Sequence, residues 1–367
     1  MEKAKVYYTN FRTTNTENQP QKLARLIKTA GMETMDFKNK FTAIKIHFGE
    51  LGNLAFLRPN YAKVVADMVK ANGGKVFLTD SNTLYVGSRK NALDHLDTAY
   101  ENGYSPFSTG CHVIIADGLK GTDEILVPID GEYVKEAKIG RALMDADIII
   151  SLNHFKGHEL TGFGGALKNI GMGGGSRAGK MEMHSNGKPV VKEELCTGCK
   201  TCLKNCANDG VVIENKKAKI IEEKCLGCGR CIGVCPEDAM VANLNEANDI
   251  LNCKIAEYTK AIIKDKPHFH ISLVVDVSPF CDCHSENDVA IVPDVGMFAS
   301  FDPVALDMAC AHAVNAQPAI LESRLGEMKH ESDDHFHNNH PSTDWRACLK
   351  HGEKIGIGSQ KYELIEI

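Results

Sequence analysis

Short apolar segments alternate with amphipathic ones through the first half of the chain. The apolar segments are rich in β-branched residues and of strand length, and they comprise residues 42–48, 75–79, 112–116 and 147–152. Residues 60–71 instead repeat apolar positions with helical spacing and end at an Asn-Gly-Gly sequence. Residues 124–138 are typical of a β-hairpin with Asp130 and Gly131 at its turn. This alternation predicts an α/β fold, a mainly parallel sheet with flanking helices.

The alternation stops near residue 186 and resumes after residue 245. There, residues 255–264 predict a helix, Asp302 and Pro303 begin a capped helix over residues 304–314, and strands are predicted at residues 270–277, 289–293 and 296–299. The intervening segment contains an internal repeat of 29 residues, from Cys196 to Cys225. We therefore expect three parts. They are the first part of an α/β domain (1–185), an inserted α+β module like a bacterial two-cluster ferredoxin (186–245), and the second part of the α/β domain (246–367).

Eight of the fourteen cysteines form two runs with the spacing C-x2-C-x2-C-x3-C, and Pro236 follows the second run. In such runs three thiolates bind one [4Fe–4S] cluster, and the fourth cysteine serves the other cluster. The predicted ligands of cluster I are Cys196, Cys199, Cys202 and Cys235. The predicted ligands of cluster II are Cys225, Cys228, Cys231 and Cys206. Structural zinc and a disulfide framework are the rival interpretations, but neither explains a doubled run that ends in proline. The spacing therefore predicts a redox protein.

Composition narrows the class of protein further. The formal net charge is −6, and no dense Lys/Arg run is present, so nothing indicates binding to nucleic acid or to an anionic membrane. The first residues lack the apolar stretch of a signal peptide, and no apolar segment approaches the roughly 20 residues of a membrane span. Fourteen cysteines in such a chain indicate thiolates kept reduced for metal binding, and hence the cytoplasm of an anaerobe.

The segment that follows the strand at residues 147–152 is rich in side chains that can do chemistry. It contains two histidines and two lysines as candidate catalytic residues, namely His154, Lys156, His158 and Lys168. Glycines let a backbone approach a ligand closely, and a following helix would present its N-terminus to an anion. The candidate cofactor-binding residues are accordingly Gly164, Gly165, Lys168 and Asn169. The alternative is a polar loop whose histidines only cap and solvate the chain.

Residues 171–180 continue this glycine-rich pattern. They match the outline of a phosphate-binding loop, but Met181 occupies the position of the required Ser or Thr, and no strand precedes them. We expect a flexible lid over a site, or a loop that contacts the inserted module. Polar residues after two earlier strands are expected to line the same cleft, although each could equally be a cap or turn residue; they are Glu50, Asn53, Asp80, Ser81 and Asn82.

A second cluster of candidate ligands comes after the cysteine runs. Cys281 and Cys283 would point to the same side of an extended segment, close enough to bind one ion such as Zn, Ni or Fe. A pair cannot complete a tetrahedral shell, so a further ligand must come from elsewhere, with His184 or His158 as candidates. A redox-active pair or two buried thiols are the alternatives. The histidines within residues 330–340 also suggest metal, but their polar surroundings favour an exposed loop with adventitious binding.

Several motifs together resemble those of the iron–sulfur centre protein family known as domain of unknown function 362. They are residues 153–173, Cys281-Asp282-Cys283, residues 292–294, residues 302–305, and the closing Asp344-Trp345 with residues 351–356. A more distant resemblance is to the nickel-pincer lactate racemase family. It rests on His158, the Gly164-Gly165 pair, Lys168 and His184, which stand in the same order and at matching spacing. That resemblance implies His158 as a proton or hydride relay, Lys168 as a cofactor tether and His184 as a nickel ligand.

These observations predict an iron–sulfur oxidoreductase in which two clusters pass electrons to a substrate or cofactor in the α/β cleft. The expected partners are a redox protein and a small anionic substrate. A non-enzymatic electron-transfer or metallocofactor-maturation protein is one alternative, and a metal-cofactor racemase or isomerase is another. No Rossmann glycine fingerprint is present, which argues against an NAD or flavin site.

Overall fold

The computed structural model describes residues 3–185, 187–244, 246–328 and 330–367. Its main feature is an eight-stranded sheet with the order β16-β1-β15-β14-β7-β2-β3-β4. All strands run in one direction except β15, which is antiparallel to both β1 and β14. The strands are β1 (Ala4–Thr9), β2 (Phe41–Lys45), β3 (Lys75–Asp80), β4 (His112–Ile115), β7 (Ile148–His154), β14 (His268–Val274), β15 (Gly296–Ser300) and β16 (Tyr362–Glu366). The mainly parallel α/β class is confirmed.

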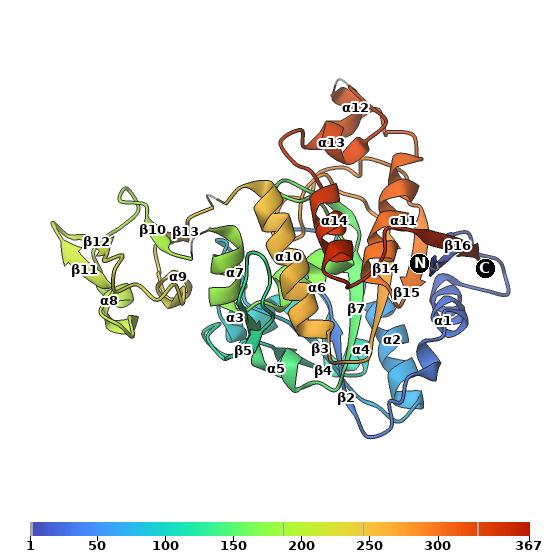
Figure 1. Ribbon diagram of the computed structural model, residues 1–367, viewed down its shortest axis with the longest axis horizontal. Helices are drawn as coiled ribbons and strands as arrows, with labels where there is room; N and C mark the ends of the chain where they lie inside the picture. Colours follow the sequence, from blue (N-terminus) through green and yellow to red (C-terminus); the bar gives the residue numbers. More distant parts are fainter. Residues whose placement is uncertain (1–2, 186, 245, 329) are drawn as a thin grey trace.

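Helices cover both faces of this sheet (Figure 1). On one face lie α1 (Gln19–Thr29) and α2 (Pro59–Ala71), and on the other lie α6 (Ala166–Gly174), α10 (Asn248–Ile263) and α11 (Pro303–Asn315). Side chains of β7 alternate between the two cores, because successive residues of a strand point to opposite faces. Both faces are thus buried, which explains the apolar character of the strand segments.

Several local predictions are confirmed. The four early strands and α2 lie where the hydrophobic pattern places them, and residues 124–138 form the hairpin of β5 (Glu124–Pro128) and β6 (Glu136–Gly140). Asp302 caps α11, since its carboxylate accepts a hydrogen bond from the Ala305 amide at 2.9 Å. Helix α10 begins at Asn248, seven residues before the predicted start at residue 255, because its first two turns carry mixed polar residues.

Three predictions are wrong. Residues 289–293 form no strand; they are an irregular connection that leads to β15. Residues 171–180 are not a loop but the end of α6 and the start of α7 (Arg177–His184), since close helix packing tolerates these glycines better than it tolerates larger residues. The histidine tract at residues 330–340 is not an exposed loop throughout, because it contains helix α13 (His335–Asn339) and three of its four histidines, His330, His335 and His340, bond to carbonyl oxygens of neighbouring segments.

Residues 187–244, here called the cysteine segment, form a small separate body at one end of the molecule (Figure 1). Two-stranded sheets pair β10 (Pro189–Val191) with β13 (Met240–Ala242) and β11 (Val211–Glu214) with β12 (Lys217–Ile220). Two short helices, α8 (Thr201–Asn205) and α9 (Arg230–Gly233), follow the first cysteines of each run. Left-handed backbone conformations recur 29 residues apart, for example at Lys200 (φ 67°) and Gly229 (φ 63°). The sequence repeat is therefore also a conformational repeat.

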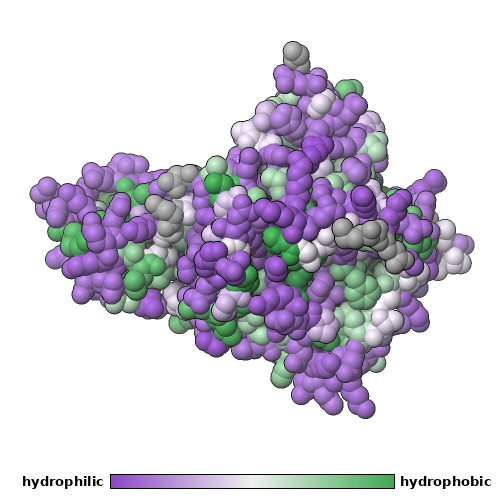
Figure 2. All heavy atoms as spheres, in the orientation of Figure 1, coloured by the Kyte–Doolittle hydropathy of each residue, from purple (hydrophilic) through white to green (hydrophobic). Residues whose placement is uncertain are grey.

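The parts of the chain before and after the cysteine segment contribute strands to the same sheet. Strands from before it (β1, β2, β3, β4 and β7) and after it (β14, β15 and β16) share one sheet, and the two ends of the chain lie close together (Figure 1). Hydrophilic side chains dominate the face shown in Figure 2, with apolar side chains only in scattered patches. Among the described residues, no helix has the length and apolar character that crossing a membrane requires.

Candidate functional site

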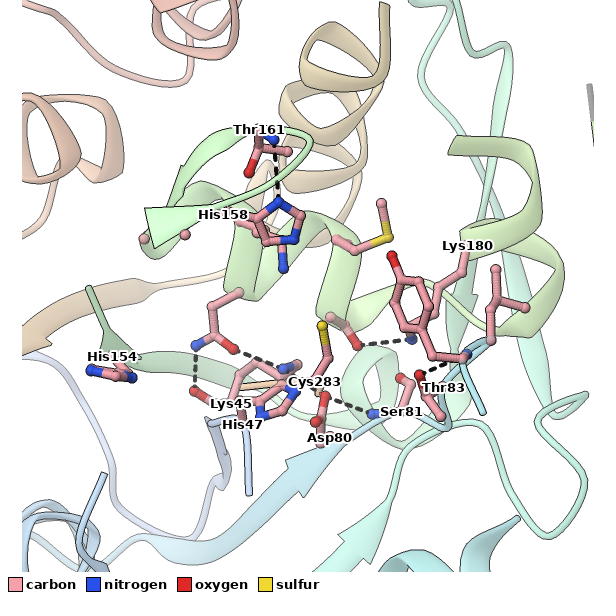
Figure 3. Close-up of a pocket in the computed structure, with 18 of the residues that line it drawn as sticks. Lys45, His47, Asp80, Ser81, Thr83, His154, His158, Thr161, Lys180 and Cys283 are labelled. Atoms are coloured by element: carbon pink, nitrogen blue, oxygen red, sulfur yellow. Dashed lines mark hydrogen bonds and ion pairs between the residues drawn. The ribbon is translucent and has the colours of Figure 1, made fainter. Parts of the chain in front are cut away.

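A buried cavity of about 70 Å³ lies at the carboxyl ends of β2, β3 and β7 (Figure 3). Parallel α/β sheets usually bind ligands at this edge, because loops diverge there and leave a crevice. The predicted residues His154, Lys156, His158, Lys168 and His184 all line the cavity. So do Gly164, Gly165 and Asn169, together with Asp80 and Ser81 after β3. Parallel strand order has thus brought together side chains from distant parts of the chain.

The walls of the cavity are strongly charged. Lys45 pairs with Asp80 at 2.8 Å, and both side chains are almost completely buried. Arg89 pairs with Glu50 at 3.0 Å. Lys156 lies 3.3 Å from Asp282. Since buried charges are costly without partners, these pairs account for much of the polar lining.

Two further lysines of the cavity wall have no such partner. In the described part of the chain, no carboxylate oxygen lies within 4.0 Å of the amine of Lys168 or Lys180. Lys180 donates instead to the carbonyl oxygens of Gly173 and Gly175, at 3.4 and 2.6 Å. Burial lowers the pKa of Lys180 to about 8, against the opposing charges of more distant carboxylates. The cavity thus offers excess positive charge to a small anion.

Helix α6 positions Lys168 and Asn169. Its first amides, those of Ala166 and Leu167, donate to the buried carboxylate of Asp307 at 2.7 and 2.9 Å. Burial raises the pKa of Asp307 to about 7, although both amide bonds oppose the shift. Asn169 bonds to Lys45 and to the end of β7, which fixes the helix against the sheet. The predicted anion-binding helix terminus is therefore already occupied by a protein carboxylate.

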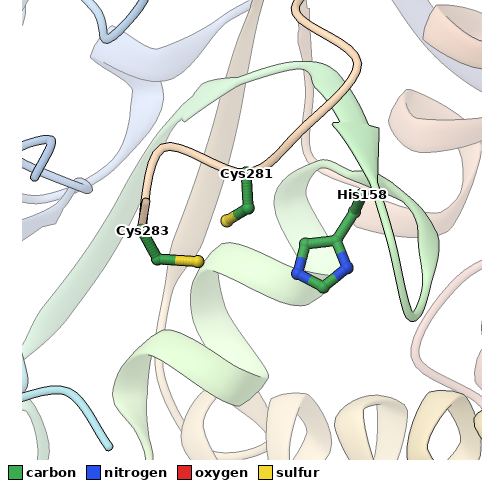
Figure 4. A group of neighbouring side chains, drawn as sticks. All are labelled: His158, Cys281 and Cys283. Atoms are coloured by element: carbon green, nitrogen blue, oxygen red, sulfur yellow. The ribbon is translucent and has the colours of Figure 1, made fainter. Parts of the chain in front are cut away.

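Cys281, Cys283 and His158 come together at one wall of the cavity (Figure 4). Their sulfur atoms and one ring nitrogen lie within 4.8 Å of one another, and all three residues are buried. Lys168 donates to the Cys281 sulfur at 3.3 Å. The Cys283 side chain and this lysine amine lower the pKa of Cys281 well below its usual value, against the effect of burial. These donor atoms are close enough to hold one metal ion.

The ring of His158 has a defined orientation. Its Nδ1 accepts hydrogen bonds from the amides of Leu160 and Thr161, at 3.0 and 3.2 Å. The Nδ1 lone pair is therefore in use, and the proton of the neutral ring lies on Nε2. The other ring nitrogen faces the two sulfur atoms (Figure 4). His158 thus presents an N–H group to the cysteines.

The two other predicted histidines have different environments. His154 directs Nδ1 to Asp282 at 2.9 Å and Nε2 to the Val275 carbonyl at 2.8 Å, so neither nitrogen is free for catalysis. His184 lies 3.2 Å from the Tyr85 hydroxyl and is not in the group that contains Cys281 and Cys283. Burial, followed by neighbouring positive charge, lowers the pKa of His184 to about 3. His158, rather than His184, therefore accompanies the cysteine pair.

Some residues of the site were missed by reasoning from the sequence. Lys45 and His47 lie in the segment taken only as a buried strand, and Tyr85 and Arg89 lie in a loop without a motif. A lysine inside an otherwise apolar strand is itself a signal, since lysine is almost never buried without a partner. A second group of three possible ligands, Glu159, Cys283 and His284, was also not foreseen as a group. In the described part of the histidine tract, no three side chains converge in this way.

The cysteine segment contains two smaller cavities, and each is lined by four cysteines. The first is lined by Cys196, Cys199, Cys202 and Cys235. The second is lined by Cys206, Cys225, Cys228 and Cys231. Four thiolates on one zinc ion would lie about 3.8 Å apart, given a Zn–S distance near 2.3 Å. Among the described residues, however, no three of these eight sulfur atoms lie within 4.8 Å of one another.

Helix α7 lies between the second of these cysteine sets and the main cavity. Arg177 is fully buried at the start of α7 and packs on the backbone of Gly229, where an added Cβ would lie 2.7 Å from its Cγ. Its Nε and Nη1 atoms have no hydrogen-bond partner among the described residues. Met181 of the same helix belongs to the apolar core of the cysteine segment, whereas Lys180 lines the main cavity. One helix therefore contacts both sites.

The fold and site define an α/β protein with a buried cationic cavity beside a cysteine-rich segment. The chain belongs to the DUF362 family, a domain of unknown function, whose model matches residues 42–312. The resemblance to this family is thereby confirmed, and its match includes the whole cysteine segment. No curated protein matches the chain.

Two of the solved structures that are similar to the chain illustrate the likeness. One is a crystal structure of a protein from Thermotoga maritima, with 13% identity, a TM-score of 0.45, and coverage of 83% of this chain and 60% of that protein. The other is the lactate racemase apoprotein from Thermoanaerobacterium thermosaccharolyticum, with 11% identity, a TM-score of 0.38, and coverage of 74% and 51%. The chain spans little more than half the length of each. Neither likeness carries a functional conclusion.

Proposed function

We propose that this protein is an iron–sulfur oxidoreductase that delivers electrons to a small anion in the main cavity. Cluster I would be held by Cys196, Cys199, Cys202 and Cys235. Cluster II would be held by Cys225, Cys228, Cys231 and Cys206. When bound, such clusters supply single electrons at low potential. The observation that carries the proposal is the position of α7, which contacts the second cysteine set on one side and the cavity on the other.

The surroundings of the cysteines fit an anionic cluster. Amides of Gly210 and Ala218 donate to the sulfurs of Cys206 and Cys196 at 3.1 and 3.3 Å, as is usual for thiolates that carry charge. The partnerless guanidinium nitrogens of Arg177 provide a buried positive charge beside the second set. Without an anion there, this arginine would be an expensive buried charge. A thiolate-bound cluster gives it a counter-charge.

The cavity supports a small anionic substrate. Lys180 contributes positive charge that the protein itself does not pair with a carboxylate, and burial strengthens its attraction for an anion, whereas the amine of Lys168 is already partnered by the Cys281 sulfur. Asn169 and Lys45 hold α6 in place, so that Lys168 keeps its position while the substrate changes charge. A separate redox protein would supply the electrons at the exposed end of the cysteine segment, where Cys199 reaches solvent.

Metal and sulfide analysis of protein purified without oxygen tests the proposal. Two clusters require about eight irons and eight sulfides per chain, and reduction should give the paramagnetic signal of [4Fe–4S] clusters. Cys199→Ser should lower the iron content, whereas the matched variant Cys111→Ser, outside both sets, should not. A chain that binds zinc and no sulfide would refute the oxidoreductase. Protein that contains both clusters but binds no small anion in its cavity would favour the electron-transfer or maturation alternative.

A metal-cofactor isomerase is the second candidate. The observation in its favour is that His158, Lys168 and His184 line the same cavity. In that function Lys168 would be the point of covalent attachment of the cofactor. Intact mass measured on the anaerobic protein decides the matter. Added mass on wild type that disappears in Lys168→Arg supports the isomerase, and an unmodified chain excludes a tethered cofactor.

A further inference from the structure

We propose that Cys281 and Cys283 form a redox-active dithiol–disulfide pair at the wall of the main cavity, where they store two electrons. The inference rests on the proposed function for its source of electrons, because each [4Fe–4S] cluster carries only one. A pair that accepts one electron from each cluster would deliver them together to a ligand in the cavity.

The local backbone places the two sulfur atoms side by side. Residues 281–284 form a turn in which the His284 amide donates to the Cys281 carbonyl at 3.2 Å. The turn directs both side chains to the same side, and their sulfur atoms lie within 4.8 Å of each other (Figure 4). A disulfide requires the two sulfur atoms to approach from this separation to about 2.05 Å.

One nitrogen–hydrogen group donates to a sulfur, and a second lies nearby. The amine of Lys168 donates to Cys281 at 3.3 Å, and a ring nitrogen of His158 lies within 4.8 Å of both sulfurs, with Oε1 of Glu159 3.8 Å from Nε2. Hydrogen-bond donors and positive charge stabilise a thiolate, which is the reduced form of the pair. A stabilised reduced form makes a disulfide a better electron acceptor. The surroundings therefore favour electron flow from low-potential clusters to the cysteines.

The same geometry disfavours a metal ion at these cysteines. A metal needs a lone pair from imidazole, but the Nδ1 lone pair of His158 is already used by two backbone amides. Binding through Nε2 would therefore require loss of those bonds or a fully deprotonated ring. The positive charge of Lys168 next to Cys281 would also repel a cation. The wall is built to hold thiolate rather than metal.

The two cysteines differ in access. Cys283 lines the cavity, whereas Cys281 lies behind it and is completely buried. Leu84 lines the same cavity and also packs in the apolar core of the cysteine segment. The next residue, Tyr85, stacks near His284 with ring centroids 5.6 Å apart. A short continuous path of packed side chains thus joins the cysteine segment to this wall.

Two electrons, one from each cluster when both are bound, would break the sulfur–sulfur bond, and one proton taken up from bulk solvent would bind to Cys283. Cys281 remains a thiolate next to Lys168. Re-oxidation of the pair then transfers two electrons and one proton to a reducible ligand in the cavity, and the disulfide forms again. Each cluster would give up one electron, and the redox protein of the proposed function would restore it.

Peptide mapping of the anaerobic holoprotein tests the pair. Trypsin should release residues 265–324 as one peptide, because Pro267 protects the bond after Lys266. This peptide contains Cys281, Cys283 and Cys310, so the buried Cys310 acts as an internal control. After treatment with diamide, denaturation and alkylation, we expect one label on this peptide. After treatment with dithiothreitol we expect three labels.

Two variants sharpen the test. Cys281→Ser should leave two labels under both conditions, with the iron content unchanged. His158→Gln should shift the thiol–disulfide equilibrium with dithiothreitol toward the disulfide, by roughly tenfold, because the reduced form loses a donor. A purely structural role for His158 would leave that equilibrium constant unchanged.

The outcomes separate this inference from the proposed function. Three labels after diamide would overturn the pair even if eight irons are present. So would a stoichiometric metal that disappears in Cys281→Ser. Conversely, a reversible pair in a chain without iron or sulfide would uphold the pair and refute the iron–sulfur oxidoreductase.

Discussion

Replacement of Lys45 by methionine tests whether the cavity depends on a buried ion pair. Lys45 and Asp80 are 2.8 Å apart, and their side chains are 1% and 3% exposed. Lys63 and Asp67 have the same separation on the surface, where both are about half exposed. At 2.8 Å the attraction is roughly 6 kcal/mol for an effective dielectric constant of 20, but roughly 1.5 kcal/mol in bulk water. Lys63→Met is therefore a surface control matched in the distance between the paired charges.

We expect Lys45→Met to lower local stability by about 3 kcal/mol, at the lower end of the range for breaking a buried pair. The cost is moderated because Arg89 lies 4.0 Å from the Asp80 carboxylate and remains as a partial partner. The surface variant should cost less than about 0.5 kcal/mol. The double variant Lys45→Met/Asp80→Asn should recover part of the loss, since no charge is then left unpaired.

Hydrogen exchange of the β2 and β3 amides is the suitable assay, because it reports local opening without denaturing the cysteine segment. A loss of 3 kcal/mol corresponds to exchange roughly 100-fold faster. In wild type the pKa of Asp80 is held well below its usual value by Lys45 and nearby cations, although burial opposes this. The ion pair therefore stabilises the protein at pH values above the pKa of Asp80 in the unfolded chain. This contribution is lost as the pH falls through the lower pKa of Asp80 in the folded protein. In Lys45→Met the burial of Asp80 should raise the pKa of its carboxyl, so that the carboxyl is protonated more readily. The loss of stability relative to wild type should therefore become smaller as the pH falls toward 5. Equal effects of the two single variants would refute the reasoning.

Three further outcomes are expected. Gly171→Ala should destabilise the protein by about 1–3 kcal/mol, measured as a lower melting temperature, because the methyl group would meet the Ile255 carbonyl oxygen where α6 packs on α10. Arg177→Met should lower the reduction potential of cluster II by roughly 60 mV in an electron-paramagnetic-resonance titration, since a buried positive charge favours the reduced cluster; an unchanged potential would contradict the role given to this arginine. Burial lowers the pKa of Lys180 to about 8, so calorimetric affinity for oxalate should fall as the pH rises through 8, and Lys180→Met should abolish that dependence.

The hydrophobic pattern was a reliable guide where structure depends on neighbours in the chain. The early strands, α2, the β5–β6 hairpin and the Asp302 cap each follow from local spacing and local hydrogen bonds. The pattern failed at residues 171–180, because a run of glycines is typical of a loop. Here the glycines lie in helices, since tight packing of α6 against α10 requires small residues there. It also failed at residues 289–293, where an apolar segment packs into the core without pairing to a strand.

By itself, the sequence determined the α/β class and the two four-cysteine runs, and it predicted that residues 153–169 form part of a site, since each depends on periodicity or spacing along a short stretch. Only the tertiary structure decided which groups share a site. Lys45, His158, Lys180 and Cys283 meet because parallel strands end at one edge and two helices cross it. As a result of this arrangement, His158 rather than His184 is the neighbour of the cysteine pair. Helix α7 lies between the two sites. Contacts between residues more than a hundred positions apart depend on strand order and packing, which no local pattern encodes.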